Sequence, residues 1–301
     1  MKNNQETENG GHTVSVIIPT MCESSRSSLL RRAIQSIASQ PGVSLEVLIV
    51  INGNKFDPQL VEDLKNDDRL SVIYLEEANV SSARHEGVRH VTSNYFCFLD
   101  DDDEFLPGAL NKRVSLFIEH HDVDVVVTNG FEHRNGEDTP LVAPGSAIDI
   151  LKNPGECFLS RNWFASPAAL FKTSTIKSDF FNFNYKYFEW TYLFFLLLSE
   201  NKNIHYDEAF SYRKYEDNPL SVSKSIEYSL GYPNFLSSLK QLPLSPNIKR
   251  IIHGKYITAL NSQSNLELKR GFIARAWISH IKCILSGGWQ YIPFTRHLLI
   301  R

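Results

Sequence analysis

The chain has 301 residues, of which 42% are hydrophobic and 22% are charged, and its formal net charge is −3. These values are typical of a soluble globular protein with one large domain or two modest ones. The nearest candidate for a membrane span, residues 192–198, falls far short of the roughly 20 apolar residues that such a helix needs. Four widely separated cysteines without a Cys-x-x-Cys pair argue against a zinc site or a disulfide framework and fit a reducing cytosol.

The net charge hides an asymmetry between the two ends of the chain. Residues 248–301 contain nine Lys and Arg against one acidic residue, a balance of +8, which leaves 22 Lys and Arg against 33 acidic residues in the rest, a balance of −11. A basic C-terminal end on an acidic body predicts an anionic partner for the tail.

Strands and helices alternate in the first third of the chain. Apolar, β-branched runs predict strands at 14–20, 45–51, 70–74 and 95–99, and helical spacing of apolar residues predicts helices at 24–40, 58–65 and 81–90. Such alternation implies right-handed crossovers and a parallel sheet with helices on both faces. Ligands of such sheets bind beyond the carboxyl ends of the strands, where Asn52 and Asp100 fall.

The rest of the chain is less regular. A helix is expected at 109–119, strands at 123–128, 168–171 and 205–213, a helix starting near Glu189, and helices from residue 226 onward, broken at Pro233, Pro243, Pro246 and Gly287-Gly288. These patterns predict a disordered polar leader at 1–12. A domain at 13–223 follows, with halves at 13–128 and 129–223, and then a helical, basic C-terminal extension at 224–301.

Five acidic residues, Asp100 to Glu104, follow the apolar strand that ends at Leu99. Their mutual repulsion raises the pKa of some of these carboxyl groups unless a cation offsets it. Carboxylate oxygens at i and i+2 are suitable ligands for a divalent cation, although a solvated acidic turn is the common reading of such a run. The chain has neither a Gly-x-Gly-x-x-Gly after its first strand nor a Gly-Lys-Ser/Thr loop. If the sheet binds a nucleotide, its phosphates therefore need a metal, and the acidic run is the clear candidate.

Three stretches resemble the family-2 inverting glycosyltransferases of the GT-A fold: residues 14–20, Ala83-Arg84-His85-Glu86-Gly87, and residues 98–110, in which Asp100-Asp101-Asp102-Asp103 is similar to the Asp-x-Asp metal signature of that family. Their order and spacing match over roughly residues 13–223. The resemblance implies an α/β fold with a Rossmann-like, mostly parallel sheet flanked by helices. It also implies hexosyl transfer from a nucleoside-diphosphate sugar, with a UDP-sugar favoured, and Mn²⁺ or Mg²⁺ as cofactor.

The resemblance also assigns roles to single residues. Asp102, with Asp103 beside it, would ligate the metal, and Asp101 is the variable position between the metal ligand and Asp100. The residues assigned to the nucleotide-sugar are Pro19, Thr20, Asn52, Arg84, Asp100 and Asp101. The chain departs from the family pattern at Asn52, where the family often has an aspartate, and at Tyr215, where it has a histidine.

An inverting transfer needs a general base that takes the proton of the acceptor hydroxyl. The family carries it in a Glu-Asp-Trp-like motif at the start of a late helix, and aligning Trp190 with that tryptophan makes Glu189 the base, with Asp179 in reserve. A lone glutamate at a helix N-terminus also simply favours the helix dipole. Trp163 and Trp190 are weaker, acceptor-side candidates, and packing is the commoner role of a tryptophan.

The C-terminal tail combines apolar residues between 272 and 284 with basic ones between 269 and 282. That pattern suits an interfacial helix on anionic lipid, and equally a helix docked on the domain or at a dimer interface. No recognition module for nucleic acid accompanies it. The resemblance implies a cytoplasmic enzyme of bacterial surface polysaccharide synthesis, peripheral at the inner face of the plasma membrane if the tail binds lipid, with a glycan or lipid-linked acceptor. The alternatives are a catalytically silent sugar- or nucleotide-binding module of the same fold and a nucleotidyltransferase, which would need a Gly-rich, basic N-terminal loop.

Overall fold

The computed structural model describes residues 12–215 and 225–299, and its contacts divide the chain into two compact units. The sheet unit comprises Met1–Lys152, Trp163–Asn184 and Lys202–Asp217, and the helical unit comprises Asn153–Asn162, Tyr185–Asn201 and Asn218–Arg301. The helical unit thus takes in segments from within the stretch 129–223, besides the predicted C-terminal extension. All of the predicted leader except His12 lies outside the described residues.

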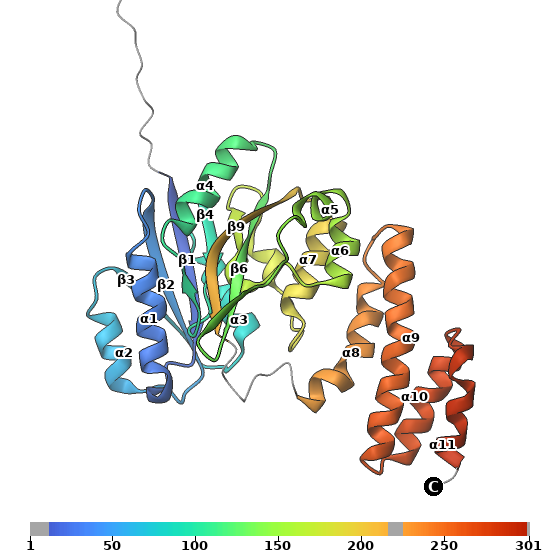
Figure 1. Ribbon diagram of the computed structural model, residues 1–301. Helices are drawn as coiled ribbons and strands as arrows, with labels where there is room; N and C mark the ends of the chain where they lie inside the picture. Colours follow the sequence, from blue (N-terminus) through green and yellow to red (C-terminus); the bar gives the residue numbers. More distant parts are fainter. Residues whose placement is uncertain (1–11, 216–224, 300–301) are drawn as a thin grey trace, which may run out of the picture. The chain divides into compact units, whose positions relative to one another are not determined.

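The described part of the sheet unit is built on nine strands, with the order β3-β2-β1-β4-β8-β6-β9-β5 and β7 paired to β6. Figure 1 shows this sheet with helices around it. Their bounds are β1 Thr13–Thr20, β2 Ser44–Asn52, β3 Leu70–Leu75, β4 Tyr95–Phe98, β5 Glu104–Phe105, β6 Val125–Arg134, β7 Glu137–Pro140, β8 Ala169–Lys172 and β9 Ile204–Tyr215. The pairings make β1, β2, β3, β4, β6 and β9 run in one direction and β5, β7 and β8 in the other. The predicted α/β fold with a mostly parallel sheet is confirmed.

Helices flank this sheet, and their bounds are α1 Ser27–Ala38, α2 Pro58–Lys65, α3 Val80–Arg89, α4 Ala109–Glu119 and α5 Ala147–Lys152. The chain moves one way across the sheet from β1 to β3 and then back to β4, so right-handed crossovers put α1 and α2 on one face and α3 on the other (Figure 1). A Cβ on Gly87 would lie 2.5 Å from the Ile17 side chain, so glycine permits the close packing of α3 on β1.

The strand β4, which precedes the acidic run, lies in the middle of the core. Its residues Phe96, Cys97 and Phe98 are fully buried, and the Phe96 ring stacks on Phe171 of β8 with 5.1 Å between ring centroids. The expectation of a strand covered on both faces is confirmed. Because a packed core tolerates little displacement, β4 is a firm base for the loop that follows it.

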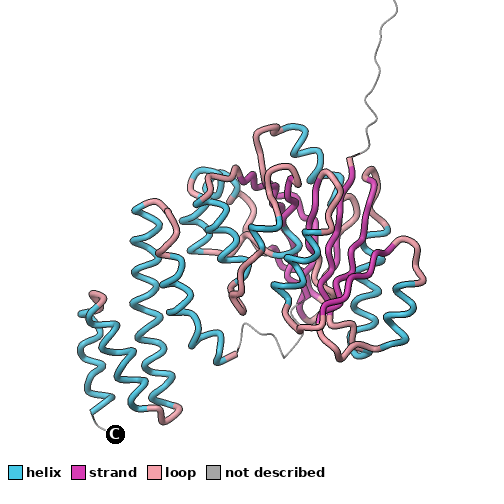
Figure 2. Tube along the Cα trace, turned by 180° about the vertical axis from the view of Figure 1, so that it is seen from behind, coloured by secondary structure: helices cyan, strands magenta, loops and turns pink. Residues whose placement is uncertain are grey.

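The helical unit contains α6 Pro154–Ser160, α7 Glu189–Ser199, α8 Ile226–Leu239, α9 Pro246–Lys269, α10 Ile273–Leu285, η5 Trp289–Phe294 and α11 Thr295–Leu299. Figure 2 shows the C-terminal part of the trace as helices joined by short loops. The expected break at Pro233 is wrong, because Pro233 lies buried inside α8. Pro246 does start a helix, with the Ser245 hydroxyl accepting from the Ile248 amide as its N-cap.

No helix among residues 12–215 and 225–299 is both long enough and apolar enough to cross a membrane.

Candidate active site

Side chains from three neighbouring parallel strands meet at one edge of the sheet, because the carboxyl ends of β1, β2 and β4 lie there. Asn52, the last residue of β2, donates from Nδ2 to the Thr20 carbonyl over 3.0 Å. The Thr20 hydroxyl at the end of β1 donates to Oδ2 of Asp101 over 2.6 Å. Pro19 is buried within β1, one residue before this edge. The structure therefore brings together the residues that the sequence assigned to the nucleotide side.

Asp100 directly follows the core residue Leu99 and is held from two sides. Arg84 of α3 donates from Nη2 to Oδ1 of Asp100 over 3.0 Å, and the Ser166 hydroxyl approaches the same oxygen at 3.2 Å. Arg84 is only 8% exposed, so it is not a surface side chain. The contact from Ser166 was not predicted, since nothing in the sequence around Pro167 indicates it.

The Asp101 carboxylate is bound by protein groups. It accepts from the Thr20 hydroxyl and from the guanidinium of Arg26, which lies in the short 3₁₀ turn after β1, η1 (Ser24–Arg26). The sequence placed Asp101 in the nucleotide-sugar site. In the structure its side chain is 9% exposed and joins β1 to the segment from Asp100 to Glu104, called the acidic loop. Arg26 was overlooked, although any residue just after β1 falls at the ligand-binding edge of such a sheet.

Asp102 and Asp103 are the two residues assigned to a metal. Asp102 pairs with Arg26 at 2.9 Å, and burial together with the charge of Asp100 raises the pKa of its carboxyl group. Asp103 is 2% exposed and accepts from the Tyr215 amide over 3.1 Å. Burial, with the charges of Asp100 and Asp102 adding to it, raises the pKa of Asp103 well above its ordinary value.

This arrangement fits a divalent cation shared with a ligand better than one held by protein alone. Residues 12–215 and 225–299 contain no group of three or more His, Cys, Asp or Glu side chains placed to hold a metal. Two neighbouring carboxylates with raised pKa values are nonetheless hard donors whose repulsion a cation relieves. Mg²⁺ is commonly bound by one or two carboxylates together with substrate phosphates. The donor set therefore matches a metal that arrives with a diphosphate.

Glu104 and Tyr215 join the acidic loop to β9. The Glu104 carboxylate contacts the Arg213 guanidinium and accepts from the Tyr215 hydroxyl over 3.1 Å. The Arg32 guanidinium lies 3.6 Å from the centre of the Tyr215 ring. The tyrosine that replaces the family histidine thus has packing and hydrogen-bonding roles at this edge.

The candidate base belongs to the helical unit. Glu189 is the first residue of α7, and Trp190 follows it. Phe188, which stands where the family has a further acid, is 5% exposed and stacks on Phe235 of α8 with ring centroids 4.4 Å apart. These contacts concern Phe188 and not the carboxylate of Glu189. The role of Glu189 therefore stays a prediction, as does that of Trp190.

The remaining predicted residues are Trp163 and Asp179. They belong to the sheet unit and are distant in sequence from the acidic loop. Trp163 is 3% exposed, and its ring packs edge-on against Tyr206 with 5.6 Å between centroids. It is a core side chain here, which is the commoner role of a tryptophan. The reserve base Asp179 is exposed in a 3₁₀ turn, η3 (Ser178–Phe181).

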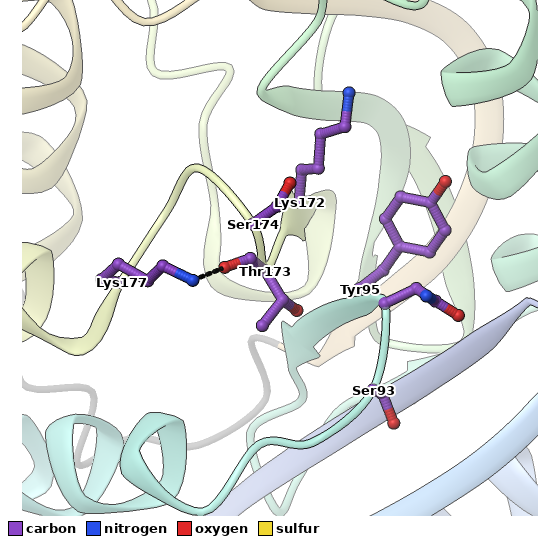
Figure 3. A pocket seen from close by; sticks show the side chains of 7 residues that line it. Ser93, Tyr95, Lys172, Thr173, Ser174 and Lys177 are labelled. Atoms are coloured by element: carbon purple, nitrogen blue, oxygen red, sulfur yellow. Dashed lines mark hydrogen bonds between the residues drawn. The ribbon is translucent and has the colours of Figure 1, made fainter.

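A small hollow of about 320 Å³ lies where β4 begins, at the opposite end of that strand from Asp100. Figure 3 shows its two lysines pointing in different directions, with Lys177 donating to the Thr173 carbonyl over 2.7 Å. Lys172 donates to the His121 carbonyl over 3.0 Å. Because each ammonium group has its own carbonyl partner, the hollow is not an evident anion site.

Comparison with known proteins agrees with this geometry. Residues 15–172 match the model of the family described as glycosyl transferase family 2, which is just over half of the chain. The chain belongs to that family. An uncharacterized glycosyltransferase of Rickettsia prowazekii is 27% identical over 119 residues, which are 40% of this chain and 36% of that protein. EpsJ of Bacillus subtilis, also an uncharacterized glycosyltransferase, is 23% identical over 254 residues, 81% of this chain and 67% of that protein.

A third relative has a specific name. The GalNAc(5)-diNAcBac-PP-undecaprenol beta-1,3-glucosyltransferase of Campylobacter jejuni is 32% identical over 102 residues, 33% of this chain and 32% of that protein. The aligned part of the chain covers only 24% to 36% of the length of the glycosyltransferases from Rickettsia prowazekii, Rickettsia conorii and Rickettsia typhi. Among solved structures, residues 1–349 of S. aureus TarS in complex with UDP-GlcNAc superpose with a TM-score of 0.60 at 16% identity, covering 91% of this chain and 81% of that one. This likeness confirms the GT-A type of fold.

Proposed function

We propose that this protein is a metal-dependent, inverting hexosyltransferase that moves a sugar from a nucleoside-diphosphate sugar to a hydroxyl of a glycan or lipid-linked acceptor. The observation that carries the proposal is the convergence of Thr20, Asn52 and Arg84 with the acidic loop at one edge of the sheet. The family membership supports it. A UDP-sugar is the favoured donor, since TarS has been solved with UDP and with UDP-GlcNAc.

The donor would be held by groups that the structure has already ordered. The Asn52 amide is oriented by its bond to the Thr20 carbonyl, so its Oδ1 is the atom that would accept from a base. Asp100, fixed by Arg84 and Ser166, would accept from the ribose hydroxyls. Fixing these side chains before the donor arrives lowers the entropy cost of binding it.

Asp102, with Asp103 beside it, would hold Mn²⁺ or Mg²⁺ together with the diphosphate. When bound, the cation supplies Lewis-acid stabilisation of the charge on the departing nucleoside diphosphate. Arg26, whose guanidinium already contacts Asp102, would add positive charge beside the diphosphate. Glu189 would take the proton of the acceptor hydroxyl as that oxygen attacks the anomeric carbon from the face opposite the diphosphate.

The acceptor and its setting follow from weaker support. The name of the Campylobacter jejuni relative, a beta-1,3-glucosyltransferase named for a GalNAc(5)-diNAcBac-PP-undecaprenol acceptor, favours a lipid-linked acceptor. Ile278, Ile281 and Leu285 of α10 are all about half exposed or more, with Lys282 exposed on the same helix. An apolar stripe beside basic side chains suits peripheral contact with an anionic leaflet.

Donor hydrolysis tests the proposal directly. With UDP-GlcNAc and other UDP-sugars plus Mn²⁺, we expect slow release of UDP, and Asp102→Ala should lower that rate by about a hundredfold or more. Asp63→Ala, at an exposed position of α2, is the matched control and should leave the rate unchanged. A protein whose melting temperature rises with UDP but which never releases sugar would instead be a silent nucleotide-sugar-binding module. A protein that responds to no nucleoside diphosphate, with or without Mn²⁺, would refute both readings.

A further inference from the structure

A long groove runs along one side of the helix α9. It consists of three adjoining hollows with volumes of about 540, 350 and 380 Å³. The first and second share Ser229 and Ser262, and the second and third share Asn265 and Lys269. Because neighbouring hollows have lining residues in common, they adjoin one another in a row, and together they are called the α9 groove. All of its walls belong to the helical unit.

The groove is extended rather than compact. The α9 residues that line it include Ile251, Lys255, Ser262, Asn265 and Lys269, and their spacings of three, four and seven positions keep them on one helix face. The eighteen positions from Ile251 to Lys269 correspond to about 27 Å along a helix with a rise of 1.5 Å per residue. A site of this shape suits a chain-like ligand.

The lining of the groove mixes polar and apolar side chains and has no negative charge. Thr258, Ser262 and Asn265 place hydroxyl and amide groups between Lys255 and Lys269, and no Asp or Glu lines any of the three hollows. Of the large apolar side chains that are exposed in the described part of the chain, only Phe294 lines the groove, at its third hollow, and none comes from α9, so the groove has no continuous exposed apolar face. A lipid surface or a partner helix would need such an apolar face. The lining therefore favours a neutral or anionic ligand that has both polar groups and apolar faces.

Aromatic side chains complete one end of the groove. Tyr228 and Tyr232 of α8 line the first hollow, and their ring planes are 12° apart with centroids separated by 6.3 Å. A sugar ring has C–H groups on its faces and hydroxyls on its rim, so tyrosine rings beside hydrogen-bonding side chains suit a row of sugars.

This aromatic end adjoins the helix that carries the candidate base. The ring of Phe188, the residue before Glu189, lies 4.6 Å from that of Tyr228. We propose that the α9 groove binds a linear glycan, neutral or anionic. Its role as the extended part of the acceptor rests on the function proposed above.

The test measures binding of linear oligosaccharides to the whole chain by calorimetry, with cellohexaose as the neutral probe and hexagalacturonate as the anionic one. Each hexamer should bind at least about tenfold more tightly than its monosaccharide, which corresponds to about 1.4 kcal/mol. Ser262→Trp should remove that advantage for both probes, since it fills the middle of the groove. The double change of Lys255→Glu and Lys269→Glu should weaken the anionic hexamer more than the neutral one.

Two control variants lie outside the groove. Gln290→Trp adds the same bulk at an exposed position of η5, and Lys282→Glu reverses a charge on α10. Both should bind the hexamers like the unaltered protein. Failure of both hexamers to bind, or equal binding by the Ser262→Trp variant, would overturn the proposal. So would binding of phosphatidylglycerol vesicles that Ser262→Trp abolishes, because the groove would then serve lipid.

The same samples separate this proposal from the proposed function. Hexamer binding without any thermal response to UDP and Mn²⁺ would retain the groove and refute the transferase. A response to UDP and Mn²⁺ without hexamer binding would do the reverse.

Discussion

The acidic loop after β4 and the groove along α9 differ in the sign of their charges and in how those charges are paired. In the loop, the carboxylates of Asp100, Asp101, Asp102 and Glu104 each contact an arginine from elsewhere in the sheet unit. In the groove, Lys255 and Lys269 line hollows that contain no acidic side chain. The loop is therefore partly neutralised by arginines of its own unit, while the groove keeps positive charge that a ligand can use.

The difference indicates what each region can bind. Arginines that hold the carboxylates in place also stand beside the site, so a cation and a diphosphate can enter together with little change in net charge. A groove whose lysines stand among hydroxyls instead attracts its ligand weakly over a long surface. Weak, extended binding suits a growing polymer that must be released after each addition.

The largest expected effect concerns whether the helical unit contributes chemistry as well as binding. Glu189→Gln should lower sugar transfer, and hydrolysis of the donor, by about a hundredfold to ten-thousandfold, because a glutamine cannot take the proton. The rise in melting temperature with UDP and Mn²⁺ should be unchanged, since the donor residues lie in the other unit.

The matched control for this change is at the other end of the same helix. Glu200→Gln removes an exposed carboxylate just after α7 and should leave both rates as they are. Release of free sugar by the Glu189→Gln protein at the original rate would remove Glu189 as an essential base and confine the chemistry to the sheet unit.

The next largest effect concerns the free energy of unfolding and tests what a fully buried arginine contributes, in contrast to the partly exposed arginines at the acidic loop. Arg113 of α4 is completely buried, donates to Thr128, Ser211 and the Pro167 carbonyl at 2.6–2.9 Å, and burial lowers its pKa to about 10. Arg113→Met should cost about 2–4 kcal/mol in the free energy of unfolding, because buried acceptors lose their donor. Urea unfolding measures this loss.

The neighbouring Lys112→Met change provides the comparison. Its ammonium group lies 3.3 Å from Asp207 and is well exposed, so the loss should stay below about 1 kcal/mol. If the Arg113→Met protein were as stable as the Lys112→Met protein, the buried hydrogen bonds of Arg113 would not stabilise the fold.

The fold could be predicted further than the site. Apolar runs and helical spacing located the strands and helices of the first half, and their alternation placed Asn52 and Asp100 at one edge of the sheet. The break expected at Pro233 failed because packing within the helical unit outweighs the loss of one backbone hydrogen bond. Segment 185–201, with Glu189, joins the helical unit through contacts distant in sequence, which periodicity cannot reveal.

The site shows the same limit. The resemblance identified Asp100 to Asp103, but it treated Asp101 as a position between two ligands. The structure instead gives its carboxylate to Thr20 and Arg26. Pairs that lie 75 to 81 positions apart leave no local pattern in one sequence. The types of the site residues and their position at the ends of strands were predictable, whereas their side-chain partners were not.

The smallest expected effect would show whether the arginines beside the acidic loop compete with a metal for its carboxylates. Arg26 lies 2.9 Å from Asp102, so a metal that binds without nucleotide must compete with its guanidinium. Arg26→Gln should therefore raise the affinity for Mn²⁺ alone by about two- to fivefold, the range of a partly exposed ion pair. Titration of free Mn²⁺ by electron paramagnetic resonance measures it, with Arg31→Gln, which loses only an exposed pair with Asp63, as control. Weaker Mn²⁺ binding in the Arg26→Gln protein would mean that the arginine orders the carboxylate for the metal, and the two regions would then differ less than their charges suggest.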